Sequence, residues 1–384
     1  MKKIMAIFGT RPEAIKMAPV IKELQRQTHW FETQVVVTGQ HRELLTQVLD
    51  LFEITPDINL QIMRHNQSLT DMTSAVIRGL EPVFRHMDPD VVLVHGDTTT
   101  TFAASLAASY HQITVGHVEA GLRSNARFDP FPEEMNRRLT SVLAAFHFAP
   151  TVAAAKNLLR EHVPAEDIFV TGNTVIDALQ SMVEPDYRFQ DPQLAALAEM
   201  AAERRIVLLT THRRENWGRP MTRIFSAIMQ IASAHPEVLV VFPVHKNPLI
   251  RKLAEEMLGG RDNIKLIDPP PYKDFANLMA RCYLIVTDSG GLQEEGPALG
   301  KPVLVLRNTT ERPEGVAAGT AELVGTEIAT VAGRINRLLT DADVYRRMVE
   351  SKNPYGDGGA AERVVAGLAY KLGLTQARPG DFDC

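Results

Sequence analysis

Short apolar runs alternate with amphipathic stretches along almost the whole chain, and this alternation constrains the fold more than any other feature. Amphipathic stretches read as helices, such as residues 13–27 directly after Pro12 and the alanine-rich residues 100–110. Short apolar strands linked by helices are typical of parallel sheets, so the pattern predicts an α/β fold. The runs that read as strands are residues 4–8, 34–37, 91–95, 114–118, 168–171, 205–209, 239–242, 264–267, 283–286 and 303–306.

The strand pattern begins again near residue 205, so the sequence predicts two Rossmann-like domains with parallel sheets and a cleft between them. A chain of 384 residues is also too long for one compact core and about right for two. We place the N-terminal domain at residues 1–175 and the C-terminal domain at residues 176–360. The C-terminal helix, within residues 361–384, is expected to pack back on the first domain, and the polar run 375–384 to be frayed.

Composition excludes several classes of partner. The formal net charge of −5 provides no broad basic field for nucleic acid. The apolar run after the N-terminal lysines stops at Gly9, which is too short for a signal segment or a membrane span, so no membrane association is expected. Cys282 and Cys384 are the only cysteines, which argues against a disulfide framework and favours a cytoplasmic location.

A paired-glycine turn, at residues 287–297, has the pattern of an anion site. It joins an apolar strand to a probable helix through Ser289, Gly290 and Gly291. Free backbone N–H groups at a helix start, together with the positive end of the helix dipole, can hold phosphate oxygens. Glu295 follows one turn later, where a carboxylate could reach the hydroxyls of a ribose. This predicts a nucleotide site, and the alternative is an ordinary βα turn that binds nothing.

Other polar residues follow the predicted strands, where open parallel sheets bind their ligands. Asp97 and Glu119 follow two such strands, although Asp97 could instead cap a helix and Glu133 could simply favour a helix dipole. Single loop histidines, such as His212, usually have no ligand role. The presence of such residues in several independent loops favours a ligand-binding site, because these loops lie at one sheet edge and supply both cations and carboxylates. No sequence pattern for a metal or a cofactor accompanies them.

Six motifs together resemble the non-hydrolysing bacterial UDP-N-acetylglucosamine 2-epimerases, in order from Ile4 to about Gly358. The resemblance implies a glycosyltransferase-B-like fold, a homodimer, and reversible conversion of UDP-GlcNAc to UDP-ManNAc, a sugar unit for cell-surface polysaccharides. The motifs are Phe8-Gly9-Thr10-Arg11-Pro12-Glu13-Ala14-Ile15-Lys16, Val94-His95-Gly96-Asp97-Thr98, Gly116-His117-Val118-Glu119-Ala120-Gly121-Leu122-Arg123, Thr211-His212-Arg213-Arg214-Glu215-Asn216, Thr287-Asp288-Ser289-Gly290-Gly291 and Arg307-Asn308-Thr309-Thr310-Glu311-Arg312-Pro313-Glu314.

The chemistry that this resemblance implies is an elimination. UDP leaves C1 as the C2 proton is removed, 2-acetamidoglucal forms, and UDP adds back with protonation from the other face. Two acid/base groups are then needed, together with stabilisation of the pyrophosphate. Asp97, Glu119 and Glu133 match the family's catalytic carboxylates. The sequence does not assign which of them removes the proton and which returns it. His212 and Arg137 match further active-site positions, and His212 is expected to bind phosphate.

The resemblance also implies a set of substrate contacts and an allosteric site for a second UDP-GlcNAc. Pro270 departs from the family pattern, because proline offers the base only a carbonyl oxygen. Asn66 stands where a basic residue of the allosteric site is expected, which puts activation in doubt. The implied substrate-binding residues are Arg11, Lys16, Asp97, Glu119, His212, Pro270, Phe275, Ser289, Gly290, Gly291, Glu295 and Arg312, and the implied allosteric residues are Gln40, His41 and His245.

Three rival functions fit parts of the same pattern. A hydrolysing epimerase would release ManNAc and UDP with nearly the same contacts. A glycosyltransferase of this fold would need an acceptor site, and a regulatory protein that only binds a UDP-sugar would not benefit from carboxylates near a pyrophosphate. The sequence therefore predicts an isomerase that needs no cofactor.

Overall fold

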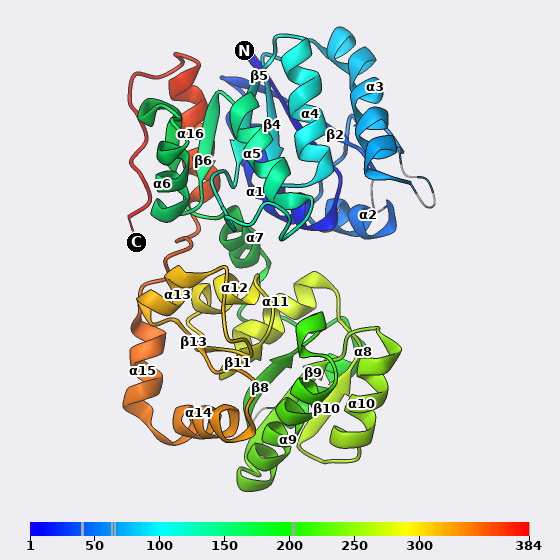
Figure 1. Cartoon of the computed structure of the whole chain (residues 1–384), viewed down its shortest axis with the longest axis vertical. Coiled ribbons are helices and arrows are strands. Elements are labelled where there is room, and N and C mark those ends of the chain that lie inside the picture. Colours follow the sequence, from blue (N-terminus) through cyan, green and yellow to red (C-terminus); the bar gives the residue numbers. More distant parts are fainter. Residues whose placement is uncertain (40–41, 63, 65–66, 202–203, 384) are drawn as a thin grey trace. The chain divides into compact units, whose positions relative to one another are not determined.

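The computed structural model describes the chain except residues 40–41, 63, 65–66, 202–203 and 384 (Figure 1). It divides into two compact units: unit 1 comprises residues 1–178 and 356–384, and unit 2 comprises residues 179–355. Unit 1 is first left after Ala178, three residues after the expected boundary at residue 175. The chain returns to unit 1 at Gly356. Among the described residues, no helix is long and apolar enough to cross a membrane.

Unit 1 contains a seven-stranded parallel sheet in its described part, with the strand order β3-β2-β1-β4-β5-β6-β7. Its elements are β1 (Lys2–Phe8), α1 (Arg11–Arg26), β2 (Phe31–Val37), α2 (Arg42–Leu51), β3 (Ile58–Asn59), α3 (Leu69–Met87), β4 (Val91–His95), α4 (Thr99–Tyr110), β5 (Thr114–Val118), α5 (Glu133–Leu143), β6 (Phe146–Ala149), α6 (Val152–Arg160), the 3-10 turn Ala165–Asp167, β7 (Ile168–Val170), the first half of α7 (Thr174–Met182) and α16 (Ala360–Lys371).

Helices cover both faces of this sheet. The helices α3, α4 and α5 pack side by side, and α1 packs with α2 and α16 (Figure 1). Strand β1 is buried throughout its second half, and its alternate residues Met5 and Ile7 join the core formed by α3 and α4. This double coverage explains why the strands read as continuous apolar runs in the sequence.

Helix α1 begins at a capping box. The Thr10 side chain accepts from the Glu13 N–H, and the Glu13 carboxylate accepts from the Thr10 N–H at 2.8 Å and from the Gly9 N–H at 3.1 Å. Thr98, not Asp97, caps α4, because its hydroxyl accepts from the Thr101 N–H at 3.1 Å. The capping interpretation of Asp97 is therefore wrong, and its side chain is available for another role.

Unit 2 contains a six-stranded parallel sheet in its described part, with the order β10-β9-β8-β11-β12-β13. Helices α9, α10 and α14 share one core with this sheet. After the end of α7, its elements are α8 (Pro192–Ala201), β8 (Arg205–Thr210), the 3-10 turn Arg214–Asn216, α9 (Arg219–Ala234), β9 (Val238–Pro243), α10 (Pro248–Leu258), β10 (Ile264–Ile267), α11 (Tyr272–Arg281), β11 (Leu284–Thr287), α12 (Leu292–Ala298), β12 (Val303–Val305), α13 (Pro313–Ala318), β13 (Ala321–Leu323), α14 (Ile328–Thr340) and α15 (Ala342–Glu350).

The predicted class, two Rossmann-like units with parallel sheets, is confirmed. Three strands lie outside the sequence prediction: β3, β6 and β13. Each is two to four residues long, and β6 and β13 contain a histidine or a glutamate within the run. Such short, interrupted runs give no periodic signal over the windows in which strands are recognised.

The prediction of a frayed C-terminal run is wrong. The Phe382 N–H donates to the Val170 carbonyl at 2.7 Å, and the Val170 N–H donates to Asp381 at 2.9 Å, so the tail lies along the free edge of β7. The Phe382 ring is buried, and the Arg378 guanidinium lies 4.4 Å from the centre of the Phe169 ring. Pairing with an otherwise exposed strand edge orders a segment whose polar composition suggested disorder.

Candidate functional site

The carboxyl edge of the unit 1 sheet brings several predicted residues together. Neighbouring strands β4 and β5 end side by side, with the Gly96 N–H donating to the Val118 carbonyl at 2.9 Å. Asp97 and Glu119 follow these two ends directly. Gly96 and Glu119 both have a left-handed backbone conformation, with φ of 67° and 61°. A non-glycine residue in this conformation is uncommon and indicates that the surrounding structure holds it there.

Glu119 is buried, and Lys16 from α1 forms an ion pair with its Oε2. The Asn173 side-chain amide donates to the same oxygen at 3.0 Å. His95 Nε2 lies 3.9 Å from this oxygen. Three segments therefore converge on the Glu119 carboxylate, and of its three neighbours Lys16, Asn173 and His95 only Lys16 was a predicted site residue.

Asp97 forms an ion pair with Arg137 of α5, and the Asn136 side chain donates to the Asp97 carbonyl at 2.9 Å. Glu133 is the first residue of α5 and is half-buried. It precedes Arg137 by four residues, so the two side chains lie on the same helix face. Helix α5 thus presents a carboxylate and a guanidinium on the face that carries the Asp97 pair.

Glu134, next to Glu133, has a structural role. Its buried carboxylate accepts from the Ser124 N–H and from the Arg138 guanidinium, both at 2.9 Å. These bonds lower the pKa of Glu134 against the opposing effect of burial. Glu134 therefore anchors the loop before α5, and Glu133 is the acidic residue of this pair that remains at the predicted site.

Three buried histidines lie on adjacent strands of unit 1. Burial lowers the pKa of His95 to about 4, that of His117 to about 3 and that of His147 to about 4. The Nε2 atom of His117 lies 2.7 Å from the Gly96 carbonyl oxygen, which supports the turn before Asp97. At neutral pH His95 is uncharged beside Glu119, so Lys16 is the cation of that contact.

In unit 2, Asp288 holds together the loops around the glycine turn. Its fully buried carboxylate accepts from the Thr211 hydroxyl at 2.7 Å, from the Arg213 N–H at 3.0 Å and from the Asn216 side chain at 3.0 Å. It also accepts from the His212 N–H. Asp288 therefore fixes the segment that carries His212 against the end of β11.

The His212 ring lies between a carboxylate and a second histidine. Its Nδ1 is 3.3 Å from Asp288, and its ring stacks on His245 with 6.0 Å between the centroids. Burial lowers the pKa of His212, and Asp288 offsets part of this effect. A neutral imidazole donates one hydrogen bond and accepts another.

The glycine turn stands directly before α12, with Gly291 as its N-cap residue and Ser289 half-buried. A Cβ on Gly290 would lie 2.9 Å from the Glu311 carboxylate, so a larger residue here would require the Glu311 side chain to move. Glu295 is buried one turn into α12, 3.5 Å from the Tyr272 hydroxyl. The predicted strand–turn–helix arrangement is therefore present.

The other predicted nucleotide contacts have these positions. Arg312 is half-buried and forms an ion pair with Glu294 of α12. Phe275 is half-buried in the first turns of α11, and Pro270 lies in the loop before that helix. Arg11 is the first residue of α1 in unit 1. Gln40 and His41, like Asn66, lie outside the described residues.

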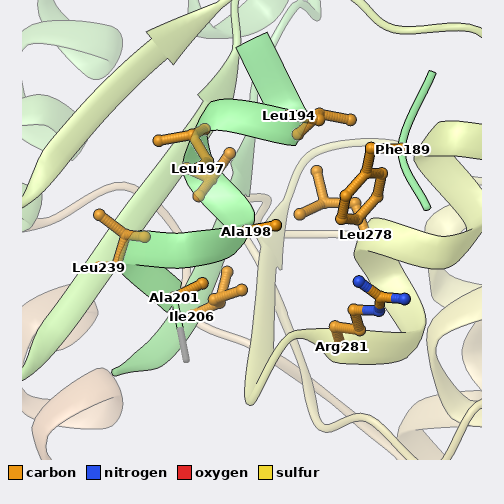
Figure 2. Close-up of a pocket in the computed structure, with 10 residues that line it drawn as sticks. Phe189, Leu194, Leu197, Ala198, Ala201, Ile206, Leu239, Leu278 and Arg281 are labelled. Atoms are coloured by element: carbon orange, nitrogen blue, oxygen red, sulfur yellow. The ribbon is translucent and has the colours of Figure 1, made fainter. Parts of the chain in front are cut away.

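An apolar cavity of about 210 Å³ lies elsewhere in unit 2, under α8 (Figure 2). The Arg281 guanidinium points toward the Phe189 ring, 4.8 Å from its centre. None of the predicted site residues contributes to its described wall, which consists of Phe189, Leu194, Leu197, Ala198, Ala201, Ile206, Leu239, Val241, Leu278 and Arg281. An apolar wall with no convergent polar groups does not suit a nucleotide.

Asn173 and Asp288 are the site residues that the sequence reasoning missed. The motif analysis quoted Asp288 without a role, and Asn173 lies outside the six motifs. A usable signal existed for Asn173, since it follows β7 at the same sheet edge as Asp97 and Glu119.

Comparison with known proteins shows which family the chain resembles. A family model described as UDP-N-acetylglucosamine 2-epimerase matches residues 22–369. A UDP-N-acetylglucosamine 2-epimerase from Yersinia pestis is 54% identical over 371 residues, which cover 95% of this chain and 98% of that protein. A crystal structure of a candidate UDP-N-acetylglucosamine 2-epimerase from Listeria monocytogenes has a TM-score of 0.94 and 48% identity, with both chains covered completely. The structure of the Neisseria meningitidis enzyme bound to UDP-GlcNAc has a TM-score of 0.88 and 48% identity, and covers 95% of this chain and 99% of that one. The predicted resemblance is thus confirmed, and the chain belongs to the UDP-N-acetylglucosamine 2-epimerase family.

Proposed function

We propose that this enzyme interconverts UDP-GlcNAc and UDP-ManNAc by eliminating UDP and adding it back, without hydrolysis. The observation that carries the proposal is the pairing of two carboxylates with cations, Glu119 with Lys16 and Asp97 with Arg137, at the ends of adjacent strands. Acid/base groups at fixed positions are what C2 inversion requires.

The bonds change as follows. A carboxylate base takes the C2 proton, the C1–O bond breaks with its electrons passing to UDP, and a C1=C2 double bond forms. In the return step, a UDP oxygen attacks C1 while an acid delivers a proton to the other face of C2. Asp97, Glu119 and Glu133 are the proposed acid/base groups, and Arg137 stabilises the charge of its partner carboxylate.

The nucleotide is proposed to bind unit 2. Ser289, Gly290 and Gly291 would meet the phosphates at the start of α12, with His212 and Arg312 adding donors. Glu295 would bind the ribose hydroxyls, and Phe275 and Pro270 would lie beside the uracil. Arg11 and Lys16 would complete the contacts from unit 1. The bound UDP-GlcNAc of the Neisseria meningitidis relative supports a nucleotide-sugar ligand.

The proposal also covers the oligomeric state, the cellular location and the use of the product. We expect a cytoplasmic homodimer whose product enters cell-surface polysaccharide synthesis. A second UDP-GlcNAc as an activator would involve Gln40, His41 and His245, of which His245 is exposed and stacks on the proposed phosphate ligand His212. This stacking would give such an activator a direct route to the active site.

Proton NMR of the purified protein with UDP-GlcNAc in D₂O, without added metal, tests the function. We expect UDP-ManNAc with deuterium at C2, because C–H cleavage exchanges the proton with solvent. Free ManNAc with UDP would instead identify a hydrolysing epimerase. No turnover with UDP still bound would point to a regulatory protein or a transferase.

A further inference from the structure

Asn173 contacts the proposed catalytic carboxylate Glu119 and lies at a structural junction of unit 1. It follows β7 and precedes α7, the helix through which the chain passes into unit 2. Its side chain is buried. A buried amide needs partners for both its oxygen and its NH₂ group, so its contacts define how it is oriented.

Only one orientation of the Asn173 amide gives both its oxygen and its NH₂ group a suitable partner. Its Oδ1 accepts from the Val175 N–H at 3.1 Å, at the start of α7, and its Nδ2 donates to Glu119 Oε2 at 3.0 Å. The flipped amide would direct an oxygen at a carboxylate and an NH₂ group at a backbone N–H. The start of α7 therefore aims the donor at Glu119.

The backbone of Asn173 is also confined. A Cβ on Gly356, where the chain returns to unit 1, would lie 3.5 Å from the Asn173 nitrogen and 3.1 Å from Ile176 Cγ1. Gly356 has a φ of 156°, and its missing side chain permits this close packing. The segment at Gly356, distant in sequence, therefore packs against the backbone of Asn173 and the first turn of α7.

In the part of the chain that the structure describes, two titratable side chains face Glu119: Lys16 from α1 and His95 from the end of β4. His95 is neutral at physiological pH and its Nε2 lies 3.9 Å from Oε2, beyond hydrogen-bond distance, whereas Lys16 and the Asn173 amide both contact this oxygen. Both donors bind Oε2, and Oε1 lies 3.5 Å from the position of a Cβ on Gly96, toward the turn that leads to Asp97.

We propose that Asn173 is a positioning residue for the reaction: its amide holds Glu119 in the ionised, correctly rotated state needed for acid/base work at C2. This rests on the proposed function, in which Glu119 is catalytic. A hydrogen bond to a charged group is stronger than one to a neutral group, and it favours the charged form.

The test replaces the donor while keeping the helix cap. Asn173→Asp and Asn173→Ser both retain an oxygen that can cap α7, so the start of that helix should be preserved. Asn173→Asp sets a carboxylate against Glu119. We expect its kcat to fall by about 10- to 100-fold with less than about a threefold change in KM. We also expect the acid limb of its kcat/KM profile to move to higher pH.

Asn173→Ser shortens the side chain and withdraws the amide from Glu119 without adding charge. Its loss of kcat and the shift of its acid limb should therefore be smaller than those of Asn173→Asp and in the same direction. Asn157→Asp is the matched control, because the Asn157 amide donates to a backbone carbonyl, that of Gly121, at 3.0 Å and accepts from Arg160, and contacts no proposed catalytic carboxylate among the described residues. This control should keep the wild-type profile. Proton NMR turnover across the pH range measures all of these quantities.

Two results would overturn the inference. One is a wild-type kcat and pH profile for Asn173→Asp. The other is an equal loss of activity and melting temperature in both Asn173 variants, which would show a purely structural role. Glu119→Gln separates this inference from the proposed function: if Glu119→Gln is inactive while Asn173→Asp is normal, only the Asn173 role fails. Full activity of Glu119→Gln would refute both.

Discussion

Single residues at the unit 1 edge differ in how firmly the fold holds them. Glu119 has a left-handed backbone conformation and only 8% of its side chain is accessible, whereas 21% of the Asp97 side chain is accessible. The cations Lys16 and Arg137 are accessible to a similar extent, at 18% and 14%, so the Asp97 carboxylate is the one more open to a substrate. Asp97 and the neighbouring Glu133 are therefore good positions at which to separate catalysis from binding.

We predict that Asp97→Asn or Glu133→Gln slows turnover by about 100-fold or more, because each removes a proposed proton-transfer group without changing side-chain size. UDP affinity should change by less than about threefold, since the proposed nucleotide contacts lie in unit 2, apart from Arg11 and Lys16, which neither substitution alters. NMR turnover and calorimetric titration with UDP measure the two effects. Asp90→Asn is the control, because Asp90 pairs with Lys2 before β4, at the opposite end of that strand. Equal losses of turnover and affinity would contradict the assignment.

At the scale of elements, the start of α16 depends on a residue of α7. The N-cap residue Gly359 offers no side chain, and the Asp177 carboxylate of α7 accepts from the Ala361 N–H at 2.8 Å instead. Burial raises the pKa of Asp177 to about 6, from an ordinary value of 3.8. The folded protein thus binds this proton more tightly than the unfolded chain, and the associated stability is lost as pH rises through about 6.

We predict that Asp177→Asn raises the free energy of unfolding relative to wild type by up to roughly 3 kcal/mol at about pH 7.5 and by much less at about pH 4–5. The buried histidines have lowered pKa values, so their contribution to stability falls as pH drops below about 6.5, but it is the same in both proteins and cancels. Urea unfolding across this range measures the difference.

Asp357→Asn is the matched control for this pH effect. The Arg363 guanidinium lowers the pKa of Asp357 to about 2, so the difference between this variant and wild type should be constant between about pH 5 and 7.5. A pH-independent difference for Asp177→Asn would show that its carboxylate is not the group that titrates.

At the scale of the molecule, the chain forms two compact units, and unit 2 has an apolar cavity beside α8. The cavity under α8 lies outside the proposed site, so its packing can be changed without touching the chemistry (Figure 2). Ala198 contributes only a methyl group to its wall. A larger apolar side chain at this position would bury additional apolar surface.

We predict that Ala198→Leu stabilises the protein by about 1–2 kcal/mol, which corresponds to a rise of roughly 2–8 °C in the melting temperature of the transition that reports unit 2. Epimerase activity should not change. Ala195→Leu makes the same substitution on an exposed face of α8 and should have no comparable effect. A loss of stability in Ala198→Leu would mean that the cavity cannot accept the added carbons.

The main strands and the strand–turn–helix around Gly290 were predictable because they depend on local chemistry: apolar runs, glycine turns and caps recur at short spacing. The partners of Asn173 and Asp288 were not predictable, since these hydrogen bonds join residues 54 positions apart and 72–77 positions apart. The docking of Phe382 on β7 was also missed, because it joins residues far apart in the chain and because the sequence around Phe382 is polar.

The sequence by itself determined the α/β class, the two units and the end of each strand at which polar side chains gather, because parallel strands place their carboxyl ends at one edge. Its motifs also determined the family. The tertiary structure alone decided which cation meets which carboxylate, which amide is aimed at Glu119 and which residues only support a loop. These choices depend on how elements far apart in the chain pack, and periodicity along the chain contains no information about that.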